Sequence, residues 1–361
     1  MMFKFDQLES IHLEISNNCQ ASCPMCNRNI NGGPDNPLLS KSDWTLSEFK
    51  QIMNEEVLAQ IKGFFFCGNF GDPMMNDDVL DMIEYSAKVN PNLNIRFHTN
   101  GGARKTDWWE QLARVMPKTH TVIFALDGLE DTHHLYRIGT NFTTILKNAK
   151  AFIDAGGRAE WCFIRFKHNE HQLLEAQQRA AELGFAQFTV KNSSRFLLEA
   201  KVQVINRKGE KLHIIEPASD TPIKFIDKKT IDSYKDYLAN SVIDCQALKT
   251  KEIYIDSYRN MMPCCWLASV PYTYIESNHA ANVRFEMLHQ YNEMVSKLGG
   301  TEQINTMTRS IKDIINSDEY QNIWDDYWGE NKLIVCARSC GRGKTDDFGK
   351  PRDQQSEVIT L

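Results

Sequence analysis

Three cysteines, Cys19, Cys23 and Cys26, lie within one stretch of eight residues, directly after an alternating apolar run at 11–15. The spacing C-x-x-x-C-x-x-C puts three thiols on one loop, where they converge on a single metal centre. A closed zinc site or an ordinary iron–sulfur cluster takes four protein ligands. Because the next cysteine, Cys67, follows an intervening helix, we predict a four-iron cluster with one iron open to an outside ligand. The alternatives are a zinc loop with a distant fourth ligand and reduced thiols without metal.

A second group of four cysteines lies in the C-terminal half and can complete a closed site: Cys245, Cys264, Cys336 and Cys340. Such a set holds either one zinc ion or a second four-iron cluster. Cys265 directly follows Cys264, and adjacent residues of an extended chain point to opposite sides, so only one of the two is expected to be a ligand. Cys67 and Cys162 lie in apolar strand patterns and are interpreted as buried small side chains.

Short apolar strands alternate with helical patterns from residue 10 to about 191. The strands are expected at 11–15, 63–67, 93–98, 120–126, 160–166 and 186–191, and the helices near 46–61, 77–89, 106–116, 142–155 and 170–183. Thr45 and Glu48 form a capping box that begins the first helix. Repeated strand–helix units predict a parallel sheet with right-handed crossovers. Six such units fit an open barrel or a doubly wound sheet, and the periodicity does not separate these two folds.

Polar and glycine-rich residues follow every one of these strands. The cysteines follow the first strand, and the later strands are followed by residues 68–73, 99–102, 127–128, 168–169 and 192–195. Ligand sites of parallel α/β folds collect at this carboxyl edge of the sheet. Ordinary turn chemistry accounts for two or three of these loops, and a ligand site explains the whole set.

The repeating pattern ends near residue 195. Residues 202–215 predict a hairpin around Asn206-Arg207-Lys208-Gly209, interpreted as solvated, and residues 252–262 predict a second hairpin that leads to Cys264. Two helical stretches follow near 278–297 and 302–329. The polar segment 346–361 is expected to be a disordered tail.

The composition is that of an ordinary globular protein, with 42% hydrophobic and 24% charged residues. A net charge of −6 argues against a nucleic-acid partner. No apolar run reaches membrane-spanning length and no signal sequence begins the chain, so we expect a cytoplasmic protein with no membrane partner. Ten cysteines in a reducing compartment indicate metal ligands or buried side chains rather than disulfides.

The cysteine spacing and the strand-end loops together resemble the radical S-adenosylmethionine (SAM) enzymes over residues 10–195. The segment Gly68-Asn69-Phe70-Gly71-Asp72-Pro73 resembles the glycine-rich loop that receives the SAM amino group. It departs from the family pattern, which often has a glutamate in place of Asp72 and one residue fewer between the glycines. Thr99-Asn100-Gly101 and the segment from Leu126-Asp127-Gly128 to Tyr136-Arg137 resemble the third- and fourth-strand segments of the peptide-modifying branch. The second cysteine group resembles the Twitch module, which holds one auxiliary cluster.

This resemblance implies an α/β fold: a partial (β/α)6 TIM-like barrel with a smaller C-terminal α+β auxiliary-cluster domain. The implied boundaries are 1–195 for the barrel, 196–240 for the hairpin and linker, and 241–345 for the Twitch-type domain. The implied cofactors are SAM and two [4Fe-4S] clusters, one held by Cys19, Cys23 and Cys26 and the other by Cys245, Cys264, Cys336 and Cys340. The implied SAM-binding residues are Met25, Gly68, Gly71, Asp72, Asn100 and Asp127, with Asn192 and Arg195 as further candidates for the SAM carboxylate or ribose.

In such enzymes the first cluster passes one electron to SAM, and the resulting 5′-deoxyadenosyl radical abstracts a hydrogen atom from the substrate. For this chain the resemblance implies modification of a peptide or a related radical oxidation, with flavodoxin or ferredoxin as the electron donor. A small-molecule radical SAM dehydrogenase is the alternative. A non-catalytic iron–sulfur electron carrier or redox sensor is a hypothesis of a different class. The sequence identifies no catalytic acid or base.

Overall fold

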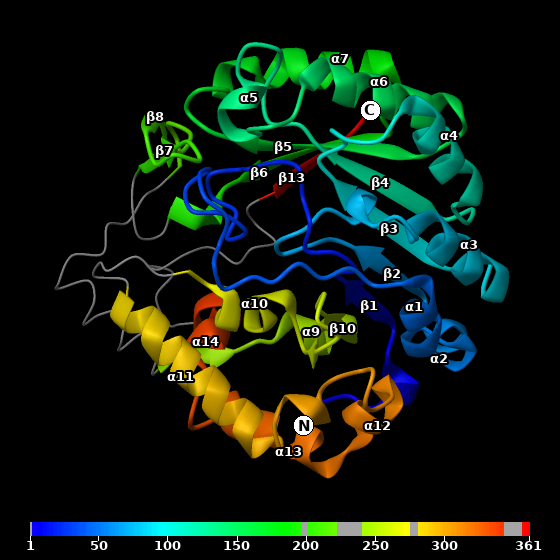
Figure 1. Ribbon diagram of the computed structural model, residues 1–361, viewed down its shortest axis with the longest axis vertical. Helices are drawn as coiled ribbons and strands as arrows, with labels where there is room; N and C mark the ends of the chain where they lie inside the picture. Colours follow the sequence, from blue (N-terminus) through cyan, green and yellow to red (C-terminus); the bar gives the residue numbers. More distant parts are fainter. Residues whose placement is uncertain (1, 197–200, 222–239, 275–280, 343–355) are drawn as a thin grey trace.

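The computed structural model describes residues 2–196, 201–221, 240–274, 281–342 and 356–361 (Figure 1). Within them, nine strands form one sheet in the order β11-β10-β1-β2-β3-β4-β5-β6-β13. Its centre is the parallel run of six strands that the sequence predicts. These strands are β1 (Ser10–Leu13), β2 (Gly63–Phe66), β3 (Asn94–Thr99), β4 (His120–Ala125), β5 (Ala159–Arg165) and β6 (Gln187–Asn192).

Helices connect these strands and cover the outer face of the sheet, as α3, α4, α6 and α7 show in Figure 1. They are α1 (Leu46–Ile52), α2 (Glu55–Gln60), α3 (Val79–Val89), α4 (Thr106–Val115), α5 (His133–Tyr136), α6 (Phe142–Asp154) and α7 (Leu173–Leu183). The capping box of Thr45 and Glu48 is confirmed. The single helix expected at 46–61 is wrong, because Asn54 leaves the helical path and its side chain caps a new helix through the amide of Val57.

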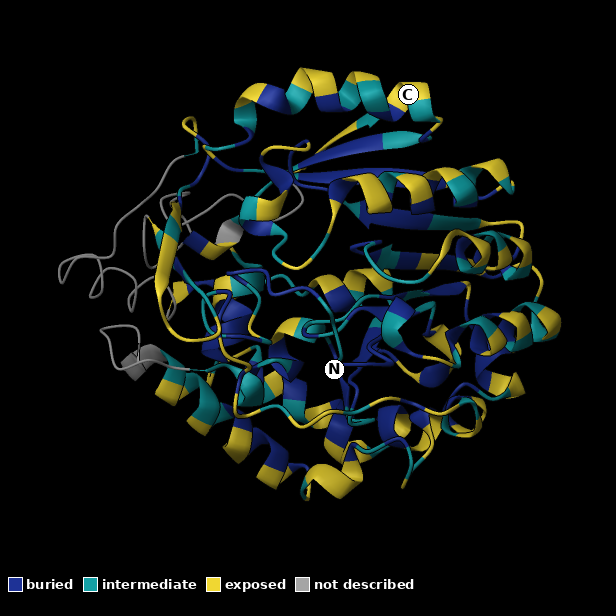
Figure 2. Cartoon of the chain, turned by 45° about the horizontal axis from the view of Figure 1, so that its top comes forward, coloured by how far each residue is buried: buried dark blue, intermediate teal, exposed yellow. Residues whose placement is uncertain are grey.

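The core lies between these helices and the outer face of the sheet. Trp109 of α4 packs on Phe124 of β4 with ring centroids 5.2 Å apart, and Phe124 also contacts Phe152 of α6. These rings are fully buried. Figure 2 shows the result: helices with one buried and one exposed side, around central strands that are mostly buried or half-buried.

The C-terminal half extends the same sheet. β10 (Glu252–Ile255) pairs in parallel with β1, and β11 (Met261–Met262) pairs antiparallel with β10, so the predicted second hairpin lies at the edge of the barrel sheet. The shorter elements around it are β9 (Val242–Ile243), which pairs with β12 (Gly341–Arg342), α9 (Gln246–Thr250) and α10 (Cys265–Ala268). Since backbone hydrogen bonds join this part to the barrel, a domain boundary at residue 241 stays a prediction.

Helices close the lower part of the molecule in Figure 1: α11 (Ala281–Lys297), α12 (Ile311–Asn316), α13 (Asp318–Tyr327) and α14 (Ile334–Cys340). The single stretch expected at 302–329 is broken because Ser310 and Ser317 each cap a new helix. Single 3-10 turns lie at Phe5–Gln7, Pro73–Met75, Glu170–Gln172, Ser194–Phe196, Val270–Tyr272 and Thr301–Gln303. In the residues described, no helix is both long and apolar enough to cross a membrane.

The hairpin at 202–215 is confirmed as β7 (Val202–Ile205) and β8 (Lys211–Ile215). Its interpretation as a solvated element is wrong for one face. Val204 and Ile215 are fully buried against the cysteine loop, in one apolar cluster with Cys23 and Met25. The amide of Ile205 also donates to the carbonyl of Asn31 at 3.0 Å.

The disordered tail expected at 346–361 is wrong for its last residues. β13 (Ser356–Thr360) pairs antiparallel with β6 over five residue pairs. The physical reason is that β6 otherwise presents an open edge, and the β-branched run Val358-Ile359-Thr360 suits a strand. Residues 346–355 lie outside the described part of the chain.

Candidate active site and a second cysteine cluster

Cys19, Cys23 and Cys26 lie on the loop that leaves β1, at the carboxyl edge of the sheet. The loop is held by its own backbone and by its neighbours: the Cys26 amide donates to the Cys23 carbonyl at 3.0 Å, and the Ser22 amide donates to the Ile138 carbonyl at 2.8 Å. Cys23 is buried, whereas Cys19 and Cys26 are half-buried. The loop is therefore ordered by contacts that need no metal.

Each of these sulfur atoms has a polar neighbour from a different strand-end loop. Asn100 Nδ2 lies 3.5 Å from Cys19 Sγ, and Arg137 Nη1 lies 3.7 Å from Cys23 Sγ. Cys26 Sγ lies 3.9 Å from the carbonyl oxygen of Asn69. Burial raises the pKa of the Cys19 and Cys23 thiols, while the nearby Arg137 acts to lower that of Cys23. A metal centre that displaces these protons would thus receive hydrogen bonds at two of its three sulfur ligands.

The chemistry of the donor set suits an iron–sulfur cluster. Three thiolates on one loop can hold such a cluster and leave one of its irons without a protein ligand. Among the described residues, no three histidine, cysteine, aspartate or glutamate side chains are arranged to enclose one metal ion.

Glu14 organises the glycine-rich loop, and the sequence-based site did not include it. Its carboxylate accepts from the amides of Phe70 and Gly71 at 2.8 and 3.1 Å, and from the hydroxyl of Tyr254 in β10 at 2.5 Å. Its side chain is 1% exposed, and burial raises its pKa to about 7. The sequence did contain a signal for Glu14, since it is an acidic residue at an alternating position of an otherwise apolar strand.

Gly68 and Gly71 are required because other backbone atoms of the protein lie very close to their Cα atoms. A Cβ atom on Gly71 would lie 1.9 Å from the carbonyl oxygen of Ser16, and one on Gly68 would lie 2.3 Å from the carbonyl oxygen of Gly71. No side chain fits at either position whether or not a ligand is bound. These contacts account for both glycines without the close approach of SAM, for which they were predicted.

Asp72 ties the second strand-end loop to the third. Its carboxylate accepts from Thr99 Oγ1 at 2.8 Å and from the amide and side chain of Asn100 at 2.7 and 2.6 Å. The residue is 4% exposed, and burial raises its pKa to about 6. A direct contact between Asp72 and SAM would require these bonds to break. Asn100 itself is turned toward Cys19 and accepts from Gln20 Nε2 at 2.6 Å.

Asp127 forms an ion pair with Arg137. Arg137 lies in the fourth-strand segment but was not among the predicted site residues. Asp127 is fully buried and pairs with Arg137 Nε at 2.6 Å, while its other oxygen accepts from the amide of Ile164 at 2.6 Å. The carboxylate raises the pKa of Arg137, which burial alone would lower. This pair fixes a cation beside Cys23.

Of the remaining predicted residues, two contact the cysteine loop and one does not. Arg195 Nη1 donates to the carbonyl of Met25, and Met25 is buried beside Cys23 and Tyr136, so these two join the cysteine loop. Asn192 is held by Arg165 Nε at 3.0 Å instead. The roles of all eight predicted residues toward SAM stay predictions.

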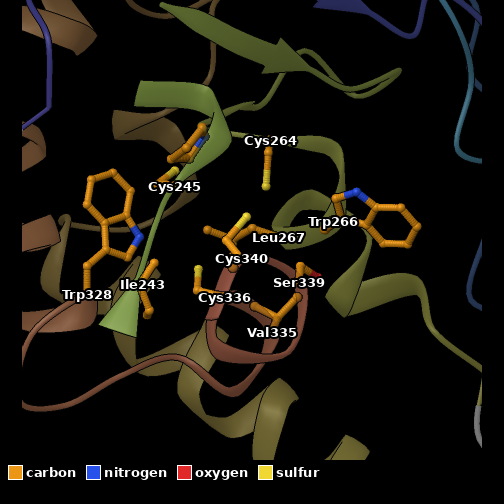
Figure 3. Close-up of a pocket in the computed structure, with 11 residues that line it drawn as sticks. Ile243, Cys245, Cys264, Trp266, Leu267, Trp328, Val335, Cys336, Ser339 and Cys340 are labelled. Atoms are coloured by element: carbon orange, nitrogen blue, oxygen red, sulfur yellow. The ribbon is translucent and has the colours of Figure 1, made fainter. Parts of the chain in front are cut away.

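The second cysteine group lines one pocket, to which Cys245, Cys264, Cys336 and Cys340 all contribute (Figure 3). In the figure their side chains point toward a common space. Cys245 precedes α9, Cys264 precedes α10, and Cys336 and Cys340 lie one turn apart on α14, which puts them on one helix face. The other lining is mostly apolar, from Ile243, Leu267, Val335 and Trp328. Burial raises the pKa of Cys264 to about 12 and that of Cys245 to about 11.

Asn69 links the two cysteine sites. Its side chain donates to the carbonyl of Cys265 at 2.8 Å and to Tyr254 Oη at 3.2 Å, while its own carbonyl is the neighbour of Cys26. The glycine-rich loop therefore contacts both sites.

No family model matches the sequence, and no curated protein sequence matches it. Solved structures do resemble its fold. SuiB of Streptococcus suis, bound to the precursor peptide SuiA, aligns with a TM-score of 0.55 at 15% identity over 88% of this chain and 66% of SuiB. This chain thus spans slightly less than two thirds of SuiB.

The enzyme anSMEcpe gives a similar result. With bound AdoMet and the Kp18Cys peptide it aligns with a TM-score of 0.51 at 14% identity, over 95% of this chain and 92% of that chain. A histidine-tagged form with bound AdoMet gives 0.50 at 14% identity, over 88% and 79%. The predicted fold class is confirmed, and the chain shares its fold, a TIM-like barrel followed by a C-terminal domain, with SuiB and anSMEcpe.

Proposed function

We propose that this chain is a radical SAM enzyme that cleaves SAM reductively and abstracts hydrogen from a peptide or a related substrate. The observation that carries the proposal is the position of the three-cysteine loop. It lies at the carboxyl edge of the sheet, and each sulfur has a polar neighbour from one of the next three strand-end loops. A three-cysteine set leaves one iron without a protein ligand, whereas an ordinary iron–sulfur cluster takes four, and this disfavours the non-catalytic hypothesis.

Cys19, Cys23 and Cys26 would hold a [4Fe-4S] cluster with one iron free for SAM. When bound, the cluster and SAM together supply an electron and a 5′-deoxyadenosyl radical. Arg137, fixed by Asp127, would donate a charge-assisted hydrogen bond to the Cys23 sulfur, and Asn100 would donate to the Cys19 sulfur. Glu14 would keep the backbone of the glycine-rich loop in place for SAM. Arg195, next to Met25, would reach toward SAM from the last strand-end loop.

Cys245, Cys264, Cys336 and Cys340 would hold a second [4Fe-4S] cluster in residues 241–345. The apolar lining of this pocket would exclude water from it. The cluster is proposed over the zinc alternative because the second cysteine group resembles the Twitch module. Cys264 rather than Cys265 is the proposed ligand, because Cys264 is among the residues that line the pocket.

A peptide substrate is supported by the fold neighbours, since SuiB is bound to a precursor peptide and anSMEcpe to the Kp18Cys peptide in their structures. Flavodoxin or ferredoxin is the proposed electron donor, as the family resemblance implies. A small-molecule radical dehydrogenase is the second candidate, and a cluster in the second cysteine pocket would then accept an electron from the substrate radical.

The test is anaerobic reconstitution with iron and sulfide, followed by incubation with SAM and dithionite and chromatography for 5′-deoxyadenosine. The reconstituted protein should release 5′-deoxyadenosine, and a Cys19→Ala, Cys23→Ala, Cys26→Ala variant should release none. A fully reconstituted protein that binds SAM without cleaving it would refute the proposal.

A further inference from the structure

The inner face of the sheet, opposite the helices, carries an unusual number of polar groups. Side chains alternate along a strand, so Trp161 and Phe188 pack toward the helices while Glu160, Cys162 and Lys191 face the other way. His12 and Phe65 stack on this inner face with ring centroids 4.0 Å apart. Barrel interiors are usually filled by branched apolar side chains. A polar inner face therefore indicates a ligand rather than a packed core.

Most polar groups of this face are already paired within the protein. Glu160 accepts from Thr189 Oγ1 at 2.5 Å and lies 3.9 Å from Arg96. His12 Nε2 contacts the carbonyl of Cys67 at 2.6 Å. Glu14 is held by Tyr254 and by two backbone amides. Among the described residues of this face, one cation remains without an ion pair.

That cation is Lys191, half-buried near the carboxyl end of β6. Among the described residues, no carboxylate lies within 4.0 Å of its ammonium group, whose hydrogen-bond partner is the thiol of Cys162. Burial raises the pKa of the Cys67 and Cys162 thiols and lowers that of His98, so these neighbours are neutral near pH 7. The Glu160 carboxylate acts on Lys191 only from beyond ion-pair distance, and it is itself held by Thr189. A half-buried ammonium group without a carboxylate in contact is costly, and an anion that completes the site would offset this cost.

The position of Lys191 suits a substrate group. Lys191 is level with Ile164 of β5, and its charge influences Cys67, which directly precedes the glycine-rich loop. It belongs to the inner face beneath the strand-end loops, whereas the predicted SAM residues lie on those loops. A ligand that reaches Lys191 would extend from the SAM site into the barrel.

We propose that Lys191 binds a carboxylate group of the substrate. The inference rests on the proposed function and narrows its substrate class to acidic peptides or small carboxylic acids. Lys191 acts here as a binding and specificity residue, and it takes no part in the chemistry of SAM cleavage.

The test uses two pairs of probes that differ only in charge, measured by calorimetry on the reconstituted protein with SAM present. The first pair is glutarate and glutaramide, and the second is acetyl-Ala-Glu-Ala-amide and acetyl-Ala-Gln-Ala-amide. Each acid should bind at least tenfold more tightly than its amide. Lys191→Gln should remove this preference and Lys191→Arg should keep it. Lys118→Gln, which removes the same charge at an exposed position, is the matched control and should change nothing.

Preference for the acidic peptide identifies a peptide source of the carboxylate, and preference for glutarate alone identifies a small acid; both support the proposal. Equal binding of acid and amide by the unmodified protein overturns it. A loss of SAM affinity in Lys191→Gln, with unchanged melting temperature, also overturns it, because the lysine would then serve the carboxylate of SAM. Probe binding does not require SAM cleavage, so a failure of the proposed function would appear separately, as the absence of 5′-deoxyadenosine.

Discussion

The two cysteine groups are built in opposite ways. Cys19, Cys23 and Cys26 come from one loop, and the side chains of Asn100 and Arg137 reach their sulfur atoms. Cys245, Cys264, Cys336 and Cys340 come from three segments and share their pocket mostly with apolar side chains. A single loop surrounded by hydrogen-bond donors is suited to a metal centre that exchanges a polar ligand. A pocket closed by several segments is suited to a centre that stays in place and contributes to folding.

The two regions should also differ in how stable their structure is without metal. The first loop is held by backbone hydrogen bonds, among them Ser22 to Ile138 and the Asp72 amide to the Asn18 carbonyl. The neighbouring strand-end loops are held in turn by the buried carboxylates of Glu14, Asp72 and Asp127. The cysteines of the second pocket lie on or next to α9, α10 and α14, which are short helices that gain little stability alone. We therefore expect metal removal to unfold the second region more than the first.

The largest expected effect separates the two sites by iron content. The unmodified reconstituted protein should hold about eight irons, and replacement of Cys19, Cys23 and Cys26 by alanine should leave about four and abolish SAM cleavage. The measurement is iron analysis together with chromatography for 5′-deoxyadenosine. A triple variant that still cleaves SAM would refute the assignment of the active cluster.

The next effect tests the second pocket through two adjacent residues. Cys264→Ala should lose about four irons and lower the melting temperature, because bound metal contributes folding free energy there. Cys265→Ala is the matched control and should keep both clusters. The reverse pattern would move the ligand to Cys265, and full retention in both variants would exclude a second cluster.

A buried charge pair beside the first site gives a smaller effect. Asp127→Asn should lower the free energy of unfolding by about 3–5 kcal/mol, because it leaves the guanidinium of Arg137 buried without its counter-charge. Urea titration of the metal-free protein measures this change. Asp35→Asn is the control, since Asp35 is exposed where it pairs with Arg28, and it should cost less than about 1 kcal/mol. Equal effects of the two variants would show that the buried Asp127–Arg137 pair contributes no more to stability than an exposed ion pair does.

The smallest effect concerns the pH dependence of stability. The folded-state pKa of Glu14 is raised from 4.5 to about 7, so the folded protein holds this proton more strongly than the unfolded chain does. The resulting stabilisation is complete below pH 4.5 and is lost as the pH rises toward 7. Glu14→Gln lacks this titration and should lose less stability over that range, by on the order of 2 kcal/mol. The measurement is the free energy of unfolding at a series of pH values. If it changed equally with pH in the unmodified protein and in Glu14→Gln, this account would be contradicted.

The six parallel strands and the site edge were predictable because strand periodicity and loop composition are local signals. The order of the strands was not, since periodicity fits a barrel and a doubly wound sheet alike, and the barrel was implied only by the family resemblance. Helix breaks at Asn54, Ser310 and Ser317 were missed, since a capping residue inside a helical pattern is recognised only once the chain turns there. The pairing of β10 with β1 and of β13 with β6 was not predictable from local patterns, because each joins residues far apart in the chain.

The same limit applies to the site. The cysteine spacing identified candidate ligands directly, whereas Glu14 and Arg137 became visible only when their partners were in place. Asp72 was identified by position as a contact for SAM, but its oxygens are occupied by Thr99 and Asn100. A polar residue at a strand end is easy to find from sequence, and its partner is not.

The antiparallel pairing of β13 with β6 has a consequence for synthesis. β6 ends at Asn192, and the strand that covers its edge begins only at Ser356. A ribosome adds about 5–20 residues per second, so the edge of β6 stays open for roughly 10 seconds or more after it emerges. During this time it is a template for pairing with other chains. Nascent chains should therefore depend on chaperones until β13 has left the ribosome.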